Sequence, residues 1–163
     1  MTRALVFDSG VGGLTIADEL RKAAPDWIVD YAADSGFFPY GVKTDDELRE
    51  RLPRLCATLV DVGKPDVLVI ACNTASTLSL DDIRARVTVP VVGTVPAIKP
   101  AAEQTTTGVI GILATPGTVR RAYLDDLERQ FAAGKVVVRR GTAGLVDMAE
   151  RAVAMAREAP EDS

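Results

Sequence analysis

The feature that most constrains the fold is an apolar run that ends at a cysteine and continues as a short polar segment. Residues 67–71 are aliphatic and mostly β-branched, as in a strand buried on both faces of a parallel sheet. Residues 73–76, Asn-Thr-Ala-Ser, are small and polar and are typical of the first turn of a helix. The sequence therefore places Cys72 where a strand ends and a helix begins.

A cysteine at this position has two interpretations. Unpaired backbone N–H groups and the helix dipole lower the pKa of a thiol from about 8.5 toward neutrality, which makes a thiolate available as a base or nucleophile. Alternatively, Cys72 is a small apolar residue of the core, because free cysteine is among the most buried residue types. Both interpretations stay open at this point.

Apolar runs and amphipathic segments alternate along the whole chain, which predicts an α/β fold with a parallel, doubly wound sheet. Strands are expected at residues 3–7, 27–33, 67–71, 89–92, 108–114 and 136–139. Helices are expected after the first three strands, and then at residues 119–131 and 142–158. Because the pattern restarts at Gly108, we expect a first domain over residues 1–95 and a partial second α/β domain over residues 96–163.

The second expected helix carries its own start signal. Residues 44–47, Thr-Asp-Asp-Glu, have the spacing of a capping box. The leucines that follow share one side of the helix with Cys56, which assigns this cysteine to the core. Pro53 lies inside the pattern and predicts a kink or break near Arg49.

Composition excludes several classes of function. The 163 residues contain no histidine, which excludes Ser-His-Asp or Cys-His catalysis and His-ligated metal sites within this chain. The net charge of −4 is spread over interspersed residues of both signs, so nucleic acid is not an expected partner. Two cysteines form no disulfide framework, and no apolar run suggests a signal peptide or a membrane span. We therefore expect a cytoplasmic protein.

Three polar segments directly follow strands of the expected sheet, and these are Asp8, the loop around Tyr40, and Cys72. Because ligands bind beyond the carboxyl ends of parallel strands, these segments should meet at one edge. Thr115 follows a strand of the second unit, so the site is expected between the two units.

The side chains at this edge suit an amino acid. Ser9, Asn73 and Thr74 offer donors near helix N-termini, which favour a small carboxylate. Asp8 would accept from an ammonium group. The alternative for Asp8 and Ser9 is helix capping.

A nucleotide site is a rival interpretation, because residues 10–15, Gly-Val-Gly-Gly-Leu-Thr, approach the G-x-G-x-x-G pattern and Asp34 ends the second strand. Thr15 at the sixth position and the negative charge of Asp8 argue against it. The paired acids at 45–46, 81–82 and 125–126 suggest surface charge in early helical turns rather than a metal site.

Four segments together resemble the bacterial glutamate racemases, of the aspartate/glutamate racemase family. They are residues 8–15 (Asp-Ser-Gly-Val-Gly-Gly-Leu-Thr), 39–41 (Pro-Tyr-Gly), 71–76 (Ala-Cys-Asn-Thr-Ala-Ser) and 114–118 (Ala-Thr-Pro-Gly-Thr). The resemblance implies cofactor-independent interconversion of L- and D-glutamate for peptidoglycan synthesis. It also implies that Cys72 is one of two catalytic thiols and that Asp8 holds or tunes it.

The resemblance also assigns the remaining candidate residues. Those that match substrate-binding positions are Ser9, Tyr40, Gly41, Asn73 and Thr74, with Thr115 and Thr118 as further ones. Glu150 falls where the family has an acid that supports the second thiol; its alternative is a border residue on an amphipathic helix.

One element of the family is absent from this sequence. Racemisation without a cofactor needs a second group on the opposite face of the substrate, and the family's Gly-Cys-Thr-His segment does not occur here. We therefore expect the N-terminal portion of a racemase, a fragment or a shortened gene product. The alternative is a catalytically incomplete fragment that acts as a carboxylate-binding or interaction module. A partial sheet leaves an unpaired edge, which predicts self-association into a homo-oligomer.

Overall fold

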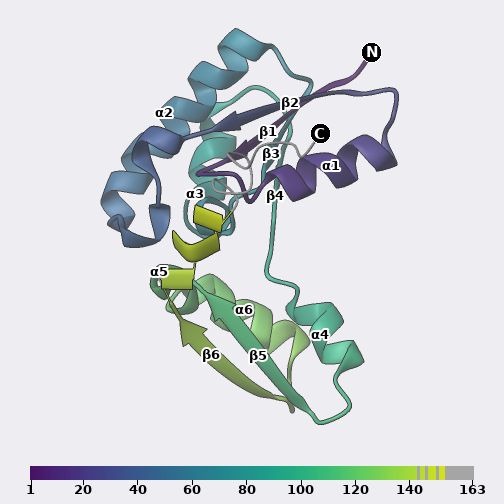
Figure 1. Ribbon diagram of the computed structural model, residues 1–163, viewed down its shortest axis with the longest axis vertical. Helices are drawn as coiled ribbons and strands as arrows, with labels where there is room; N and C mark the ends of the chain where they lie inside the picture. Colours follow the sequence, from purple (N-terminus) through teal and green to yellow (C-terminus); the bar gives the residue numbers. More distant parts are fainter. Residues whose placement is uncertain (143, 146, 150, 153–163) are drawn as a thin grey trace, which may run out of the picture.

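The computed structural model describes residues 1–142, 144–145, 147–149 and 151–152. Strands and helices alternate through this part of the chain (Figure 1). The strands are β1 (Arg3–Asp8), β2 (Ile28–Ala33), β3 (Val67–Ile70), β4 (Val91–Gly93), β5 (Val109–Ala114) and β6 (Val136–Gly141). The α-helices are α1 (Leu14–Ala23), α2 (Asp45–Gly63), α3 (Asn73–Arg86), α4 (Ile98–Gln104), α5 (Pro116–Val119) and α6 (Ala122–Phe131). Two 3₁₀ turns, η1 (Ser35–Phe37) and η2 (Tyr40–Val42), precede α2.

The first four strands form one parallel sheet in the order β2-β1-β3-β4. Side chains of β1 alternate between its two faces. Leu5 and Phe7 pack in the cluster that contains the buried residues of α2 and α3, whereas Val6 packs with Ala17 of α1. Helices therefore cover both faces, which confirms the expected doubly wound α/β arrangement. We call residues 1–93 the N-terminal lobe.

Helix α2 begins as its sequence predicts but continues where a break was expected. Thr44 N donates to Glu47 Oε2 at 2.8 Å, and Glu47 N donates to Thr44 Oγ1 at 3.3 Å, so the capping box is present. A break near Arg49 does not occur, because the helix runs through Pro53 to Gly63. Buried residues on both sides of Pro53 hold the helix against the core, and this packing outweighs the one backbone bond that proline cannot make.

The second sheet is smaller and parallel, with β5 paired to β6. Helices α4 and α6 cover one of its faces, where Ile110 packs with Ile98 and Leu124. The other face carries exposed apolar side chains, which are Val109, Leu113, Val136 and Val138. We call residues 98–142 the C-terminal lobe, and Figure 1 shows it below the N-terminal lobe, with α5 at the end nearest that lobe.

Along the chain, residues 94–97 connect the last strand of the first sheet to helix α4, which precedes the second sheet. The domain boundary expected between residues 95 and 96 remains our interpretation. The last expected helix lies partly outside the described residues, and Glu150 is one of the residues outside them. No helix among the described residues has both the length and the apolar character to cross a bilayer.

Candidate active site

Parallel register brings Asp8 and Cys72 to the same edge of the first sheet. Phe7 pairs with Ile70, and Asp8 pairs with Ala33. The chain therefore leaves β1 and β3 side by side, and the residues that follow each strand become neighbours. This is the clustering at the carboxyl edge that the sequence predicted.

The Asp8 carboxylate holds the glycine-rich turn that follows it. Its Oδ1 accepts from Ser9 N at 2.7 Å, and its Oδ2 accepts from Gly13 N at 2.8 Å. Gly13 permits this close approach, because a Cβ there would lie 2.9 Å from the Cβ atoms of Asp8 and Ala71. Asp8 therefore binds the turn before α1, and its carboxylate also lies close enough to raise the pKa of the Cys72 thiol.

Cys72 occupies the N-cap position of α3 and is only 6% exposed. Its Sγ lies 3.6 Å from Ser9 Oγ. Burial, together with the charge of Asp8, raises the pKa of this thiol to about 11, against smaller lowering effects of Ala75 N–H and Ser9. The expected fall toward neutrality is therefore wrong for the free chain, because the helix N-terminus does not compensate for desolvation.

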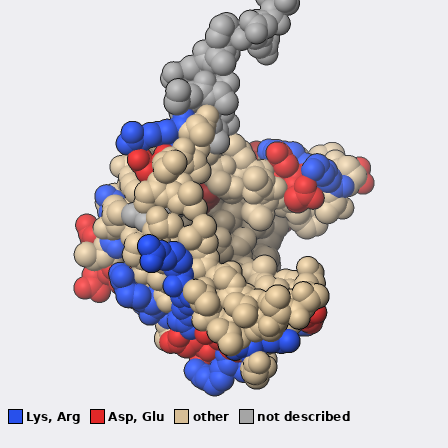
Figure 2. All heavy atoms as spheres, turned by 60° about the horizontal axis from the view of Figure 1, so that its bottom comes forward, with Lys and Arg blue, Asp and Glu red and all other residues tan. Residues whose placement is uncertain are grey.

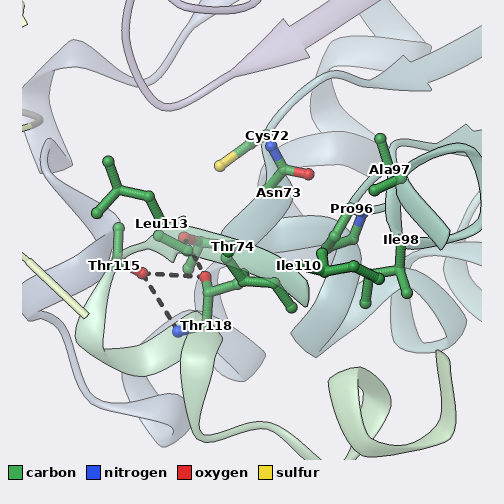
Figure 3. Close-up of a pocket in the computed structure, with 14 residues that line it drawn as sticks. Cys72, Asn73, Thr74, Pro96, Ala97, Ile98, Ile110, Leu113, Thr115 and Thr118 are labelled. Atoms are coloured by element: carbon green, nitrogen blue, oxygen red, sulfur yellow. Dashed lines mark hydrogen bonds between the residues drawn. The ribbon is translucent and has the colours of Figure 1, made fainter. Parts of the chain in front are cut away.

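A cavity of about 500 Å³ opens beside Cys72 between the two lobes. The N-terminal lobe contributes Cys72, Asn73 and Thr74, and the C-terminal lobe contributes Thr115 and Thr118. The remaining wall is mainly apolar, with Pro96, Ile98, Ile110 and Leu113 among its residues. Figure 3 shows the thiol of Cys72 and the amide of Asn73 across from the threonine hydroxyls. We call this space the threonine cavity.

Three hydroxyl groups link the lobes at the floor of this cavity. Thr115 Oγ1 lies 3.0 Å from Thr118 Oγ1 and accepts from Thr118 N at 3.2 Å. Thr118 Oγ1 in turn lies 3.5 Å from Thr74 Oγ1 (Figure 3). The resemblance described above assigned these three threonines to substrate-binding positions, and the structure brings their hydroxyls close together. Hydroxyls that can both donate and accept suit a carboxylate ligand.

A second cavity of about 500 Å³ lies on the other side of Cys72, and we call it the Asp8 cavity. Asp8, Ser9 and Thr94 line it, and it shares Cys72 and Asn73 with the threonine cavity. The thiol therefore stands between a carboxylate-lined space and a hydroxyl-lined space.

Tyr40 is fully buried near the site, but its hydroxyl has a partner within the protein. It donates to Asp34 Oδ2 at 2.7 Å, and Asp34 also accepts from Arg51 Nε and Nη2 at 2.7 Å each. The hydrogen bonds of Arg51 lower the pKa of Asp34, and burial with the Asp34 charge raises the pKa of Tyr40. This cluster fixes the loop before α2, and it occupies the acid that a nucleotide site would have used.

Phe37 completes the same cluster. Its ring lies 4.4 Å from Lys43 Nζ and 4.7 Å from the guanidinium carbon of Arg51. Sequence reasoning missed Arg51, because it stands seventeen positions from Asp34 and no local pattern pairs them. An arginine near the exposed side of a capped helix gives no signal of such a contact.

Gly41 marks a close contact between the lobes. A Cβ at this position would lie 2.8 Å from Thr115 Cγ2 and 2.9 Å from Thr115 Cβ. Glycine is therefore required by the neighbouring threonine rather than by a positive φ.

Among the described residues no group of three Cys, Asp or Glu side chains converges in the manner of a metal site.

Comparison with known proteins gives one consistent set of relatives. A family model described as Asp/Glu/Hydantoin racemase matches residues 14–161. The glutamate racemase of Sphingopyxis alaskensis is 53% identical over 146 residues, which cover 90% of this chain and 54% of that protein. The glutamate racemase of Brucella anthropi is 58% identical over 129 residues, covering 78% of this chain and 46% of that protein. The chain thus spans about half the length of the curated relatives it matches.

Solved structures agree with the sequence relatives. Escherichia coli glutamate racemase, in complex with L-glutamate and the activator UDP-MurNAc-ala, superposes with a TM-score of 0.82 at 45% identity. That match covers 91% of this chain and 56% of the other. The glutamate racemase of Aquifex pyrophilus gives a TM-score of 0.75 at 32% identity, over 86% of this chain and 55% of that one.

Proposed function

This chain belongs to the Asp/Glu/Hydantoin racemase family, and from that premise we propose that it carries one of the two proton-transfer groups of a glutamate racemase. The observation that carries the proposal is the position of Cys72, between the Asp8 cavity and the hydroxyls of the threonine cavity. The reaction would interconvert L- and D-glutamate without a cofactor, in the cytoplasm, and would supply D-glutamate for peptidoglycan and hence for cell shape.

In this proposal Cys72 exchanges the α-proton of glutamate on one face. As a thiolate it removes the proton, and as a thiol it delivers one. A pKa of about 11 leaves Cys72 mainly in its protonated form near pH 7 in the chain without substrate. The resting thiol is therefore in its proton-donating form, and removal of a proton requires that the bound substrate favour the thiolate.

The neighbouring residues take supporting roles in the proposal. Asp8 holds the turn that places Ser9 at 3.6 Å from the thiol. The N-terminus of α3, with Asn73 and Thr74, is a suitable partner for a substrate carboxylate. Thr115 and Thr118 would bind from the opposite wall of the cavity.

Tyr40 and Gly41 are proposed to shape the site rather than to bind glutamate with a polar atom. The Tyr40 hydroxyl bonds to Asp34, and Gly41 gives space to Thr115. The role proposed for Glu150, support of a second thiol, concerns a residue outside the described part of the chain.

The group for the opposite face is not the other cysteine of this sequence. Cys56 is fully buried in the core of the N-terminal lobe, and burial raises the pKa of its thiol to about 12. Two-face proton transfer therefore requires a partner group other than Cys56, whereas one-face exchange requires only Cys72.

Exchange of the glutamate α-proton with deuterated solvent tests the proposal directly. We expect the 163-residue chain to exchange the proton of one glutamate enantiomer, measured by proton NMR, and expect Cys72→Ser to abolish the exchange. Cys56→Ser is the matched control, with exchange retained. Binding of glutamate without exchange in the parent chain, unchanged in Cys72→Ser, would instead indicate a carboxylate-binding module. Inversion is followed in parallel by a D-amino-acid oxidase assay.

A further inference from the structure

A third cavity, of about 710 Å³, lies between the lobes on a different set of residues. The start of α2 and the middle of α3 form one side, and the segment from α5 into α6 forms the other. It shares no lining residue with the threonine cavity or the Asp8 cavity. We call it the arginine cavity, and the argument for it does not depend on the proposed function.

The charges that line the arginine cavity are mainly positive. Five charged residues line it, four of them cationic and one acidic, and these are Lys43, Arg49, Arg120, Arg121 and Asp45. The Lys43 ammonium also contacts the Phe37 ring. Arg49 also pairs with Asp82 at 2.9 Å. Figure 2 shows both kinds of charge on one face of the molecule, with some cationic side chains next to one another and others beside acidic ones. A cavity with this excess of positive charge favours an anion.

Arg121 is the most unusual of these residues, because its side chain is only 9% exposed. Its Nη2 donates to Asp45 Oδ1 at 3.1 Å. Its Nε and Nη1 have no acceptor anywhere in the part of the chain that the structure describes. A buried guanidinium with unmet donors is costly unless a counter-charge compensates it.

Asp45 compensates Arg121 only in part. The Asp45 side chain is 61% exposed, so solvent screens its charge. Burial lowers the pKa of Arg121, in keeping with incomplete compensation. The positive charge of Arg121 is therefore only partly balanced, beside a cavity that this residue lines.

The N-terminus of α6 adds to the same cavity. Arg121 is the N-cap of this ten-residue helix and provides no side-chain cap. Ala122 and Tyr123, the first two residues of the helix, line the cavity. Backbone N–H groups in a first helical turn have no partner within their helix and attract anions.

We propose that the arginine cavity binds a compact, multiply charged oxyanion of the phosphate class, with Arg121 as its principal cation. A dianion matches four cations and one carboxylate better than a single carboxylate ligand does. Lys43 and Arg49 belong to the N-terminal lobe, and Arg120 and Arg121 belong to the C-terminal lobe. The bound anion would therefore join the two lobes at a point away from the thiol.

Calorimetric titration of the 163-residue chain with inorganic phosphate, at low ionic strength and pH 8, tests the proposal. We expect one saturable site that weakens as sodium chloride is added. Arg121→Gln should weaken binding by about tenfold or more, since it removes the charged fork. Arg129→Gln is the matched control, because Arg129 lies on the same helix, is 75% exposed and pairs with Asp126; its affinity should stay within about twofold.

A second variant covers the possibility that Arg121→Gln unfolds the chain, which circular dichroism would reveal. Lys43→Gln combined with Arg120→Gln removes two cations of the same cavity, and we expect at least a threefold loss of affinity, roughly, from these more exposed groups. A titration with glycerol phosphate distinguishes a free phosphate from a phosphate ester, since only an ester site would prefer the latter. Absence of saturable binding of either ligand, equal losses in the Arg121 and Arg129 variants, or glutamate binding there as tightly as phosphate would each overturn the proposal.

Discussion

The two lobes build their sheets in different ways. The N-terminal lobe places β1 and β3 in the interior of a four-stranded sheet with helices on both faces. In the described part of the chain, both strands of the C-terminal lobe are edge strands, and one face of their sheet is exposed. Cys72 follows a central strand, and Thr115 follows an edge strand. Cys72 therefore follows a strand with a neighbour on each side, whereas Thr115 follows a strand with one neighbour among the described strands.

Truncation of one leucine in each sheet should give the largest contrast. Leu68 in β3 is fully buried, and Leu113 in β5 is 60% exposed. We expect Leu68→Ala to lower the free energy of unfolding by about 3 kcal/mol, from lost burial and a residual cavity. Leu113→Ala should change it by less than about 0.5 kcal/mol. Urea unfolding monitored by circular dichroism measures both, and similar losses in the two variants would contradict the contrast between the lobes.

The hydrogen bonds of Asp34 with Tyr40 and Arg51 in the N-terminal lobe should give the next largest effect on the free energy of unfolding. Asp34→Asn removes the negative charge and one of the two oxygens that accept from Arg51 and Tyr40, and we expect a loss of about 2 kcal/mol at pH 7. Because the pKa of Asp34 is lowered in the folded chain, its stabilisation is present above the unfolded pKa of about 3.9 and is lost as the pH falls through the lower folded pKa.

The difference between the parent chain and Asp34→Asn should therefore shrink as the pH falls from about 5 through 3.9. Fluorescence of Trp27, the only tryptophan, follows this lobe during unfolding. Asp30→Asn is the matched control, since Asp30 pairs with Arg3 at a half-exposed site and should cost less than about 1 kcal/mol. A difference in unfolding free energy that does not change with pH would argue that the ionised Asp34 carboxylate is not the source of the stabilisation.

The two cysteines test how the border between the lobes differs from the core. The thiol pKa is about 11 for Cys72 and about 12 for Cys56, and only Cys72 lines cavities described above. We expect iodoacetamide to modify Cys72 at least tenfold faster, roughly in proportion to thiolate content, with rates that rise with pH up to about 11. Peptide mass spectrometry measures both rates, and unfolding in urea should make them equal. Faster modification of Cys56 than of Cys72 in the folded chain would contradict the placement of Cys56 in the core and of Cys72 beside the cavities.

The exposed face of the second sheet should give the smallest change in stability and a change in association. We expect the chain to self-associate through this face, because it presents apolar residues on edge strands. Val138→Lys should raise the monomer fraction in sedimentation velocity, with stability changed by less than about 0.5 kcal/mol. Gln130→Lys adds the same charge at an exposed position of helix α6 and should leave association unchanged. A monomeric parent chain would refute the expectation.

The sequence predicted most of what local patterns and parallel topology determine. The alternation of strands and helices, the capping box at Thr44 and the meeting of Asp8 with Cys72 follow from short-range signals and the rule for parallel sheets. The pKa of Cys72 could not be predicted in this way, because it depends on burial by residues distant in the chain. The same reason applies to the contact between Arg51 and Asp34, and to the buried Arg121 beside Asp45.

The contact between Gly41 and Thr115 is one of the places where the two lobes approach closely. A single methyl group at residue 41 would act as a wedge, since it would meet the threonine at 2.8 Å. The walls that carry Cys72 and Thr118 would then be driven apart. The absence of a side chain at Gly41 thus allows the short distance between the two walls of the cleft.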